Sequence, residues 1–453
     1  MLQHFPRLVG WASAMSDLKY AAQLDAETEL RFQKIAIGLK KRRAASRRLK
    51  TYGVLAILTA LSFLVILLTT IISNGYTALQ QTELLVELSF PEDKLGASDG
   101  SLDLKKSQNF NWDGLVKKAF VSEFKEVKTR LDQRALTEII SKNAGYDLRR
   151  QIEKTGILPV GKTKVWIKTS DDVDMFMKGR IDRTIEERKR RLSDQQLDWV
   201  DDLVSFNRVR LVFNKTFFTA ADSREPESSG VLGATVGSAM ALFVTVLLAL
   251  PLAVMAAVYL EYFAPPGRVT DFIEVNVNNL AAVPSIVFGL LGLAVFLGFF
   301  GMPRSAPLVG GMVLALMTLP TIIIATRASI RAVPTSIRDA ALGLGASRMQ
   351  AAIDHVLPIA APGILTGTII GIAQALGETA PLIMIGMVAF IVDVPATLTD
   401  PATALPVQIY IWSDSAERAF YERSSLAIMV LLTFLISMNI SAVLLRRKFE
   451  KKW

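Results

Sequence analysis

Residues 356–391 read VLPIAAPGILTGTIIGIAQALGETAPLIMIGMVAFI, an apolar stretch whose single formally charged residue is Glu378. The hydrocarbon core of a bilayer is about 30 Å thick, and roughly 20 apolar residues cross it as a helix. Helices and closed barrels are the structures that satisfy their backbone hydrogen bonds in lipid. The sequence therefore predicts a transmembrane helix that carries a carboxylate.

Further apolar stretches of comparable length lie on both sides of this one. They cover Tyr52–Ile72, Gly230–Leu260, Val275–Met302, Ser305–Thr326 and Ser424–Leu445. Basic clusters precede the first of them and follow the last, and Lys and Arg accumulate on the cytoplasmic side of membranes. We expect an all-α polytopic membrane protein with six transmembrane helices, inserted multi-pass with both termini in the cytoplasm.

The composition narrows the chemistry that the chain can perform. Of its 453 residues, 51% are hydrophobic, and the formal net charge is +9. In a soluble protein this charge would favour nucleic-acid binding, but here the basic residues flank apolar stretches, so we expect membrane lipid and no nucleic acid. The chain has no cysteine, and His4 and His355 are far apart. We therefore predict no metal site, no cofactor and no catalytic residue.

The distribution of polar residues predicts five regions. They are a basic cytoplasmic segment (1–50), the first transmembrane helix (51–74), an extracytoplasmic insert (75–229), a core with five transmembrane helices (230–446) and a cytoplasmic tail (447–453). Within the first region, Ala26–Leu39 is either a helix along the membrane surface or part of a poorly ordered tail. The insert is predicted to be an α+β domain, with strands at 83–90 and 163–169 and helices at 114–142 and 171–191.

The segment before the quoted stretch predicts a short helix, a turn and a second helix on the cytoplasmic side. Residues 336–358 read SIRDAALGLGASRMQAAIDHVLP. Gly345 can end the first helix because glycine tolerates the left-handed conformation of helix ends. The spacing resembles the EAA loop through which ABC importer permeases contact their ATPase. The matching residues are Asp339, Ala340, Ala341, Gly345, Leu357 and Pro358, with Asp339 in place of the usual Glu and His355 in place of the usual Ile.

Three further motifs resemble one family of these permeases. Residues 219–230 read TAADSREPESSG, residues 279–289 read NLAAVPSIVFG, and residues 373–382 read AQALGETAPL. They are similar to the A-type permease of phosphate-specific ABC importers, the PstA family, over about residues 207–445. The resemblance implies a type I importer fold, a second homologous permease subunit, an ABC ATPase dimer and a periplasmic phosphate-binding protein. The insert and the basic N-terminal segment resemble an extension of some members.

The predicted substrate path centres on Glu378. A carboxylate within the bilayer is costly unless it faces a partner or a cavity, and Gly377 and Pro381 on either side weaken the helix, as in transporters whose broken helices line the substrate path. Family members often carry Arg at the position of Gln374, so a cation for phosphate would come from the partner permease. We expect Gln374, Pro284 and Ser285 to line the same path. A structural role for Glu378 within the bundle is the alternative.

Two other functions are compatible with parts of the sequence. A permease for another oxyanion or small solute would use the same cytoplasmic loop, and a membrane-anchored sensor or scaffold would use the insert as its sensing domain. The six apolar stretches and the intramembrane Glu378 favour a transporter. The chain has no G-x-x-x-x-G-K-[ST] motif, so a transporter of this kind is itself no enzyme and relies on an ATPase partner.

Overall fold

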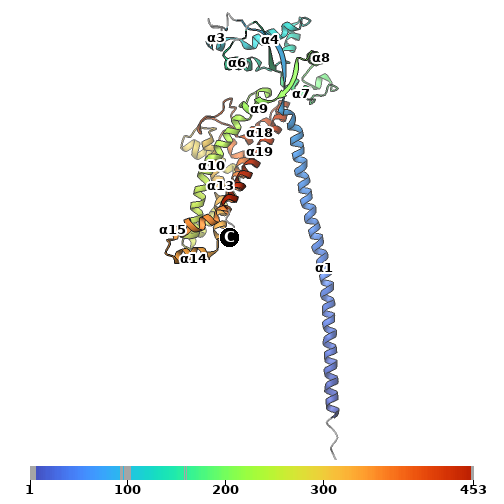
Figure 1. Ribbon diagram of the computed structural model, residues 1–453, viewed down its shortest axis with the longest axis vertical. Coiled ribbons are helices and arrows are strands. Elements are labelled where there is room, and N and C mark those ends of the chain that lie inside the picture. Colours follow the sequence, from blue (N-terminus) through green and yellow to red (C-terminus); the bar gives the residue numbers. More distant parts are fainter. Residues whose placement is uncertain (1–6, 92–94, 96–103, 158, 160, 450–453) are drawn as a thin grey trace, which may run out of the picture. The chain divides into compact units, whose positions relative to one another are not determined.

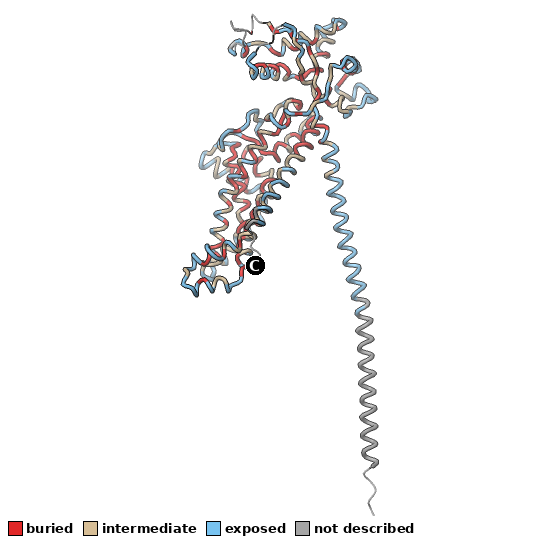
Figure 2. The backbone as a smooth tube through the Cα atoms, in the orientation of Figure 1, coloured by how far each residue is buried: buried red, intermediate tan, exposed pale blue. Residues whose placement is uncertain are grey.

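The computed structural model describes residues 7–91, 95, 104–157, 159 and 161–449, and it divides into two compact units, residues 1–70 and 71–453. The first unit holds most of one long helix, α1 (Arg7–Gly75), shown in blue in Figure 1. Residues 26–39 are part of this continuous helix. Apolar side chains of α1 such as Ile57 and Phe63 are exposed (Figure 2).

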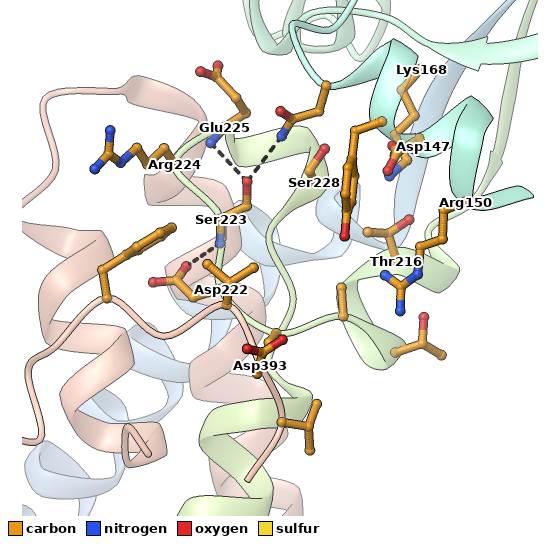
Figure 3. A pocket seen from close by; sticks show the side chains of 18 of the residues that line it. Asp147, Arg150, Lys168, Thr216, Asp222, Ser223, Arg224, Glu225, Ser228 and Asp393 are labelled. Atoms are coloured by element: carbon orange, nitrogen blue, oxygen red, sulfur yellow. Dashed lines mark hydrogen bonds and ion pairs between the residues drawn. The ribbon is translucent and has the colours of Figure 1, made fainter. Parts of the chain in front are cut away.

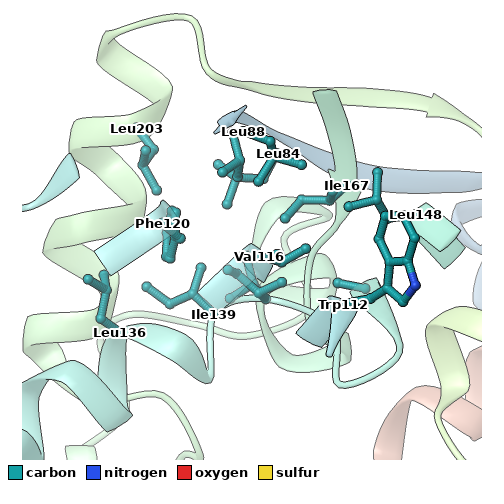
Figure 4. Packing of buried hydrophobic residues seen from close by; sticks show 14 of the residues in the cluster. Leu84, Leu88, Trp112, Val116, Phe120, Leu136, Ile139, Leu148, Ile167 and Leu203 are labelled. Carbon is teal, nitrogen blue, oxygen red and sulfur yellow. The ribbon is translucent and has the colours of Figure 1, made fainter. Parts of the chain in front are cut away.

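The insert is built around a three-stranded antiparallel sheet of order β2-β1-β3. The central strand β1 (Gln80–Ser89) pairs with β2 (Lys162–Lys168), where Glu83 lies opposite Lys168, and with β3 (Val209–Phe213), where Gln80 lies opposite Phe213. Inward-facing strand residues pack against helices in a core of large apolar side chains (Figure 4). The predicted α+β character and both predicted strands are confirmed.

The helices of the insert are shorter and more numerous than predicted. The expected helix at 114–142 is divided into α4 (Trp112–Glu123) and α5 (Arg130–Thr137), because Thr129 caps α5 by accepting a hydrogen bond from the Asp132 N–H. The expected helix at 171–191 ends with α7 (Asp171–Met177), and Gly179 leaves the helical conformation with φ +71°. The prediction missed α6 (Ala144–Thr155), α8 (Asp194–Ser205) and β3.

The remaining elements of the insert and its connection to the membrane region are short. They are η1 (Tyr76–Leu79), α3 (Leu104–Asn109), η2 (Glu187–Lys189), α9 (Lys215–Thr219) and η3 (Pro226–Ser228).

Most of α1 belongs to the first unit, and the other long apolar helices form a helical bundle within the second. Five helices of the described chain are long and apolar enough to cross a membrane, within Arg42–Leu79, Leu232–Phe263, Pro307–Arg331, Arg348–Gly377 and Arg418–Leu444. Their elements are α1, α10 (Leu232–Val258) with the π-helical turn η4 (Tyr259–Phe263), α13 (Pro307–Arg331), α15 (Arg348–Gln350) with η6 (Ala351–Val356) and α16 (Leu357–Gly377), and α19 (Arg418–Phe449). Helices α10 and α13 pack side by side (Figure 1). The predicted polytopic helical fold is confirmed.

Two of the predicted spans are broken in the structure. The stretch 275–302 is divided into α11 (Arg268–Ala281) and α12 (Ser285–Gly292), which continues as the π-helix η5 (Leu293–Phe299), and the two parts meet at 100°. Pro284 stands at the break, where its ring fixes φ and removes a backbone donor. The stretch 356–391 stops being helical after Gly377, and only the short helix α17 (Ala380–Met384) follows, so Glu378 does not lie inside a helix as predicted.

The first residues of α19 connect the bundle to the insert. The Lys178 ammonium lies 2.6 Å from an oxygen of Asp174 and 3.1 Å from an oxygen of Glu422 on α19. The other Asp174 oxygen accepts the Thr82 N–H of β1 at 2.7 Å. All three charged side chains are at least 93% buried. Since a buried charge is tolerated only with partners, this triad fixes the insert to α19. The short helix α18 (Leu405–Ser413) packs beside it.

Candidate functional site

The break after α16 exposes the predicted path residues. Glu378 has extended backbone angles (φ −78°, ψ 128°) and is half-buried, while Gln374 in the last turn of α16 is exposed. Within the described part of the chain, the Glu378 carboxylate has no hydrogen bond or ion pair. A carboxylate in this position therefore keeps its acceptor capacity for a group that is not part of this chain.

A second break lies beside the first because α12 packs on α17. A Cβ added to Gly289 of α12 would lie 2.7 Å from the Pro381 Cα and 3.0 Å from the Met384 Cβ. Pro284 and Ser285 start α12 one turn before this contact, and Glu378 precedes α17. The packing thus brings the two broken elements together, although no hydrogen bond joins Glu378 to Pro284 or Ser285.

The predicted cytoplasmic loop has the expected helix–turn–helix form. Helix α14 (Thr335–Gly343) carries Asp339 and Ala340 on its exposed side and Ala341 on its buried side. Gly345 has φ +93°, the left-handed conformation that the sequence predicted. Leu344 next to it is 91% exposed. Ser347 caps the following helix, in which Leu357 is half-buried and Pro358 is exposed.

An ionic cluster that the sequence analysis missed lies close to this loop. Arg327 donates from Nε to Glu261 at 2.7 Å and also pairs with Glu274, and Arg331 donates from Nε to Glu261 at 3.0 Å. We call these four residues the arginine–glutamate cluster. The i,i+4 spacing of the two arginines places them on one face of α13 and was the one local indication of this cluster. Their acidic partners are distant in sequence.

A cavity of about 600 Å³ opens between the insert and the bundle (Figure 3). The motif 219–230 lines one side of it through Asp222, Ser223 and Arg224, and Arg150 on α6 faces it from the insert. The Trp412 indole donates to Asp222 at 3.0 Å, and burial raises the pKa of that carboxyl. The motif thus forms a polar junction between the two regions.

Further acidic groups are buried in this junction. Burial raises the pKa of Glu227 to about 7, against the effect of the Ser141 hydroxyl, which donates to it at 2.5 Å. Burial and the charge of Asp171 raise the pKa of Asp172 to about 6. Carboxyl groups with such values change charge near neutral pH, so we expect the stability of the junction to depend on pH.

Comparison with known proteins places the bundle in a family. The profile described as "Binding-protein-dependent transport system inner membrane component" matches residues 249–452. The chain is 32% identical over 222 residues to the phosphate transport system permease protein PstA 1 of Mycobacterium tuberculosis, which covers 49% of this chain and 72% of that protein. The chain belongs to the PstA family of phosphate transport system permeases.

The chain is also similar to other transporter proteins. It is 34% identical over 168 residues to the probable ABC transporter permease protein YqgI of Bacillus subtilis, 37% of this chain and 56% of that protein. It is 28% identical over 253 residues to the phosphate transport system permease protein PstC of Pasteurella multocida, 50% of this chain and 77% of that protein. A solved structure of the MetNI methionine ABC transporter is 17% identical, with a TM-score of 0.39 over 49% of this chain and 96% of that one.

The similarities divide the site residues into two groups. The permease profile includes Glu378, the loop at residues 336–358 and the arginine–glutamate cluster. Residues 36–187, which hold the first span and much of the insert, match a domain of unknown function, DUF3333. The PstA-family chain therefore combines a permease bundle with an extension that matches a separate family.

Proposed function

We propose that the chain is the membrane-spanning permease subunit of an ABC importer that translocates inorganic phosphate across the inner membrane. The observation that carries this proposal is the Glu378 carboxylate at the break between α16 and α17, which has no partner among the described residues, in a bundle of the PstA family. In this account, residues 230–446 form the permease core and residues 75–229 form an extracytoplasmic insert, with residues 1–50 and 447–453 in the cytoplasm.

The chemistry of Glu378 suits phosphate better than sulfate. Phosphate near neutral pH keeps at least one proton and can donate a hydrogen bond to a carboxylate. Sulfate has no proton at that pH and would meet an uncompensated negative charge. Gln374 on α16 and the backbone at Pro284 and Ser285 supply further polar groups at the two breaks. Gln374 carries no positive charge, so the second, homologous permease supplies the cation that binds phosphate.

The cytoplasmic loop couples this path to an ATPase dimer. Asp339, Ala340 and Gly345 lie on its exposed surface, and the exposed Leu344 forms an apolar projection for a groove of the ATPase. Ala341 on the buried side of α14 and the half-buried Leu357 position the loop, and Pro358 lies in the first turn of α16. A periplasmic phosphate-binding protein delivers phosphate from the other side.

The direct test is uptake of labelled phosphate by proteoliposomes that contain the chain, its partner permease and its ATPase. We expect uptake that requires ATP and the binding protein and is not inhibited by excess sulfate. Uptake of another oxyanion in preference to phosphate would support the alternative permease function. Absence of any ATP-dependent uptake would support a sensor or scaffold.

The orientation has its own test. Gln195 on α8 is exposed, and the natural chain has no cysteine, so a Gln195→Cys variant reports this position alone. An impermeant thiol reagent is expected to label it in intact spheroplasts. Labelling only after rupture of the inner membrane would place the insert in the cytoplasm.

A further inference from the structure

The arginine–glutamate cluster joins three elements at the end of the bundle that bears the cytoplasmic loop. Glu261 lies in η4 at the end of α10, Glu274 lies in α11, and the two arginines lie in the last turns of α13. The side chains of Arg327 and Glu261 are 11% and 13% exposed. Solvated anchors at a membrane surface would be more exposed, so these groups serve an internal contact.

One side of the cluster is tied to the coupling helix α14. Three residues, Ala332 to Pro334, separate Arg331 from the first residue of α14. Ile337 of α14 packs in an apolar cluster with Ala257 and Val258 of α10. A displacement of α14 therefore acts directly on the last turn of α13 and on the end of α10.

The other side of the cluster holds α11. No residue of α11 is fully buried, and Val277 packs against an apolar cluster that includes Ile322 of α13, so the ion pair to Glu274 adds a specific contact to this packing. Glu274 is the one α11 residue with an ion pair in the described chain, to Arg327 and, at 3.8 Å, to Arg331. Helix α11 leads through the 100° break at Pro284 into α12, which packs on α17 beside Glu378.

We propose that the arginine–glutamate cluster transmits movement of the coupling helix α14 to α11, and through the break at Pro284 to the substrate path. Glu274 is the positioning residue of this connection. The inference rests on the proposed function, since it requires an ATPase that moves α14. Rigid helices joined by specific ion pairs can carry such coupling between distant sites.

The experiment measures the movements of α14 and α11 separately. Two double-cysteine variants are labelled with spin probes. The first carries labels at Ser336 on α14 and Thr433 on α19. The second carries labels at Asn278 on α11 and Thr433 on α19. All three positions are exposed, and the natural chain has no cysteine. Distances are measured in the full complex with its ATPase, with and without ATP, and both pairs are expected to respond in the parent chain.

Glu274→Gln removes the charge of the positioning residue. We expect the α14 response to remain and the α11 response to be lost, with phosphate uptake reduced by about tenfold while ATP hydrolysis continues. Glu274→Asp keeps the charge and is expected to retain both responses. Asp271→Asn removes a carboxylate from the same helix, where Asp271 is exposed and has no side-chain partner in the described chain, and is expected to change neither response.

The outcomes separate the inference from the proposed function. A normal α11 response in Glu274→Gln, or an equal loss in Asp271→Asn, would overturn the role of the cluster while leaving the importer function intact. A parent chain in which neither pair responds to ATP would overturn the proposed coupling to an ATPase, and the inference with it.

Discussion

The insert and the membrane bundle differ in the contacts that hold their elements together. The insert buries large side chains such as Phe120, Leu136 and Leu197, each with no exposed surface. In the bundle, the closest contacts are made where a side chain is missing. A Cβ on Gly237 would lie 2.4 Å from the Thr403 carbonyl oxygen, and one on Gly311 would lie 2.5 Å from the Ala241 carbonyl oxygen.

The difference follows from the solvent that each region meets. In water, the removal of apolar surface drives folding, so large buried side chains stabilise the insert. In lipid, the surroundings of a helix are as apolar as its neighbours, and close backbone approach contributes instead. Large-to-small substitutions should therefore weaken the insert most, and small-to-large substitutions should weaken the bundle most.

The largest expected effect is in the core of the insert. Phe120→Ala should lower the free energy of unfolding of the insert by about 3–5 kcal/mol, because it removes a fully buried aromatic ring and leaves a cavity. Phe288→Ala in the bundle is the matched substitution and should cost less, since lipid offers an apolar alternative. Denaturant unfolding of the full chain, followed by tryptophan fluorescence and by helicity, measures both. Equal losses would contradict the comparison.

The junction between the two regions should respond to pH. Burial raises the pKa of Glu227 to about 7, so the folded protein keeps a proton that the unfolded chain releases near pH 4.5. Stability should therefore fall as the pH rises between these values, by about 3 kcal/mol at most. Asp172 contributes in the same direction with a pKa of about 6.

Thermal unfolding between about pH 5 and pH 8 tests this junction. Glu227→Gln should remove most of the decline, because it removes the group that is forced to ionise. Glu126→Gln is the control, since Glu126 is exposed and its loss is expected to leave the slope in place. A parent chain with no decline would show that Glu227 is charged when folded.

A smaller loss is expected where helices of the bundle meet. Gly311→Val should cost about 1–3 kcal/mol, because the new side chain collides with the α10 backbone at Ala241. Gly53→Val in α1 is the control, since no atom lies within 4 Å of the position of its Cβ. Heating in detergent followed by size-exclusion chromatography compares the two variants. Equal thermal stability would mean that α10 and α13 can separate without cost.

The smallest effect on stability is expected in the cytoplasmic loop. Gly345→Ala should lower the free energy of unfolding by about 1–2 kcal/mol. The loss comes from the φ of +93° alone, since there is open space around the Cβ position. Gly343→Ala, in helical backbone two residues earlier, should cost nothing. Transport should fall in the Gly345 variant at unchanged membrane insertion. A Gly345 variant that transports normally would contradict the coupling role of the turn.

Much of this architecture is visible in the sequence. The apolar stretches, the two long strands and the turn at Gly345 follow from local composition and from the properties of glycine. The breaks at Pro284 and Glu378 are marked by proline and glycine, but the bend at Pro284 depends on neighbouring helices that a single stretch does not reveal. The pairing of Arg327 with Glu261 and Glu274 joins residues 53 or more positions apart, so no local pattern predicts it.

The most direct test of the central claim is phosphate uptake by the Glu378→Gln variant in proteoliposomes with the complete transport system. Gln keeps the shape of the side chain and removes the negative charge of the group that accepts a hydrogen bond from phosphate. Asp414→Asn, an exposed carboxylate after α18, is the matched control. We expect sharply reduced uptake in Glu378→Gln with the complex still assembled, and normal uptake in the control. Uptake by Glu378→Gln at the parent rate would contradict this claim.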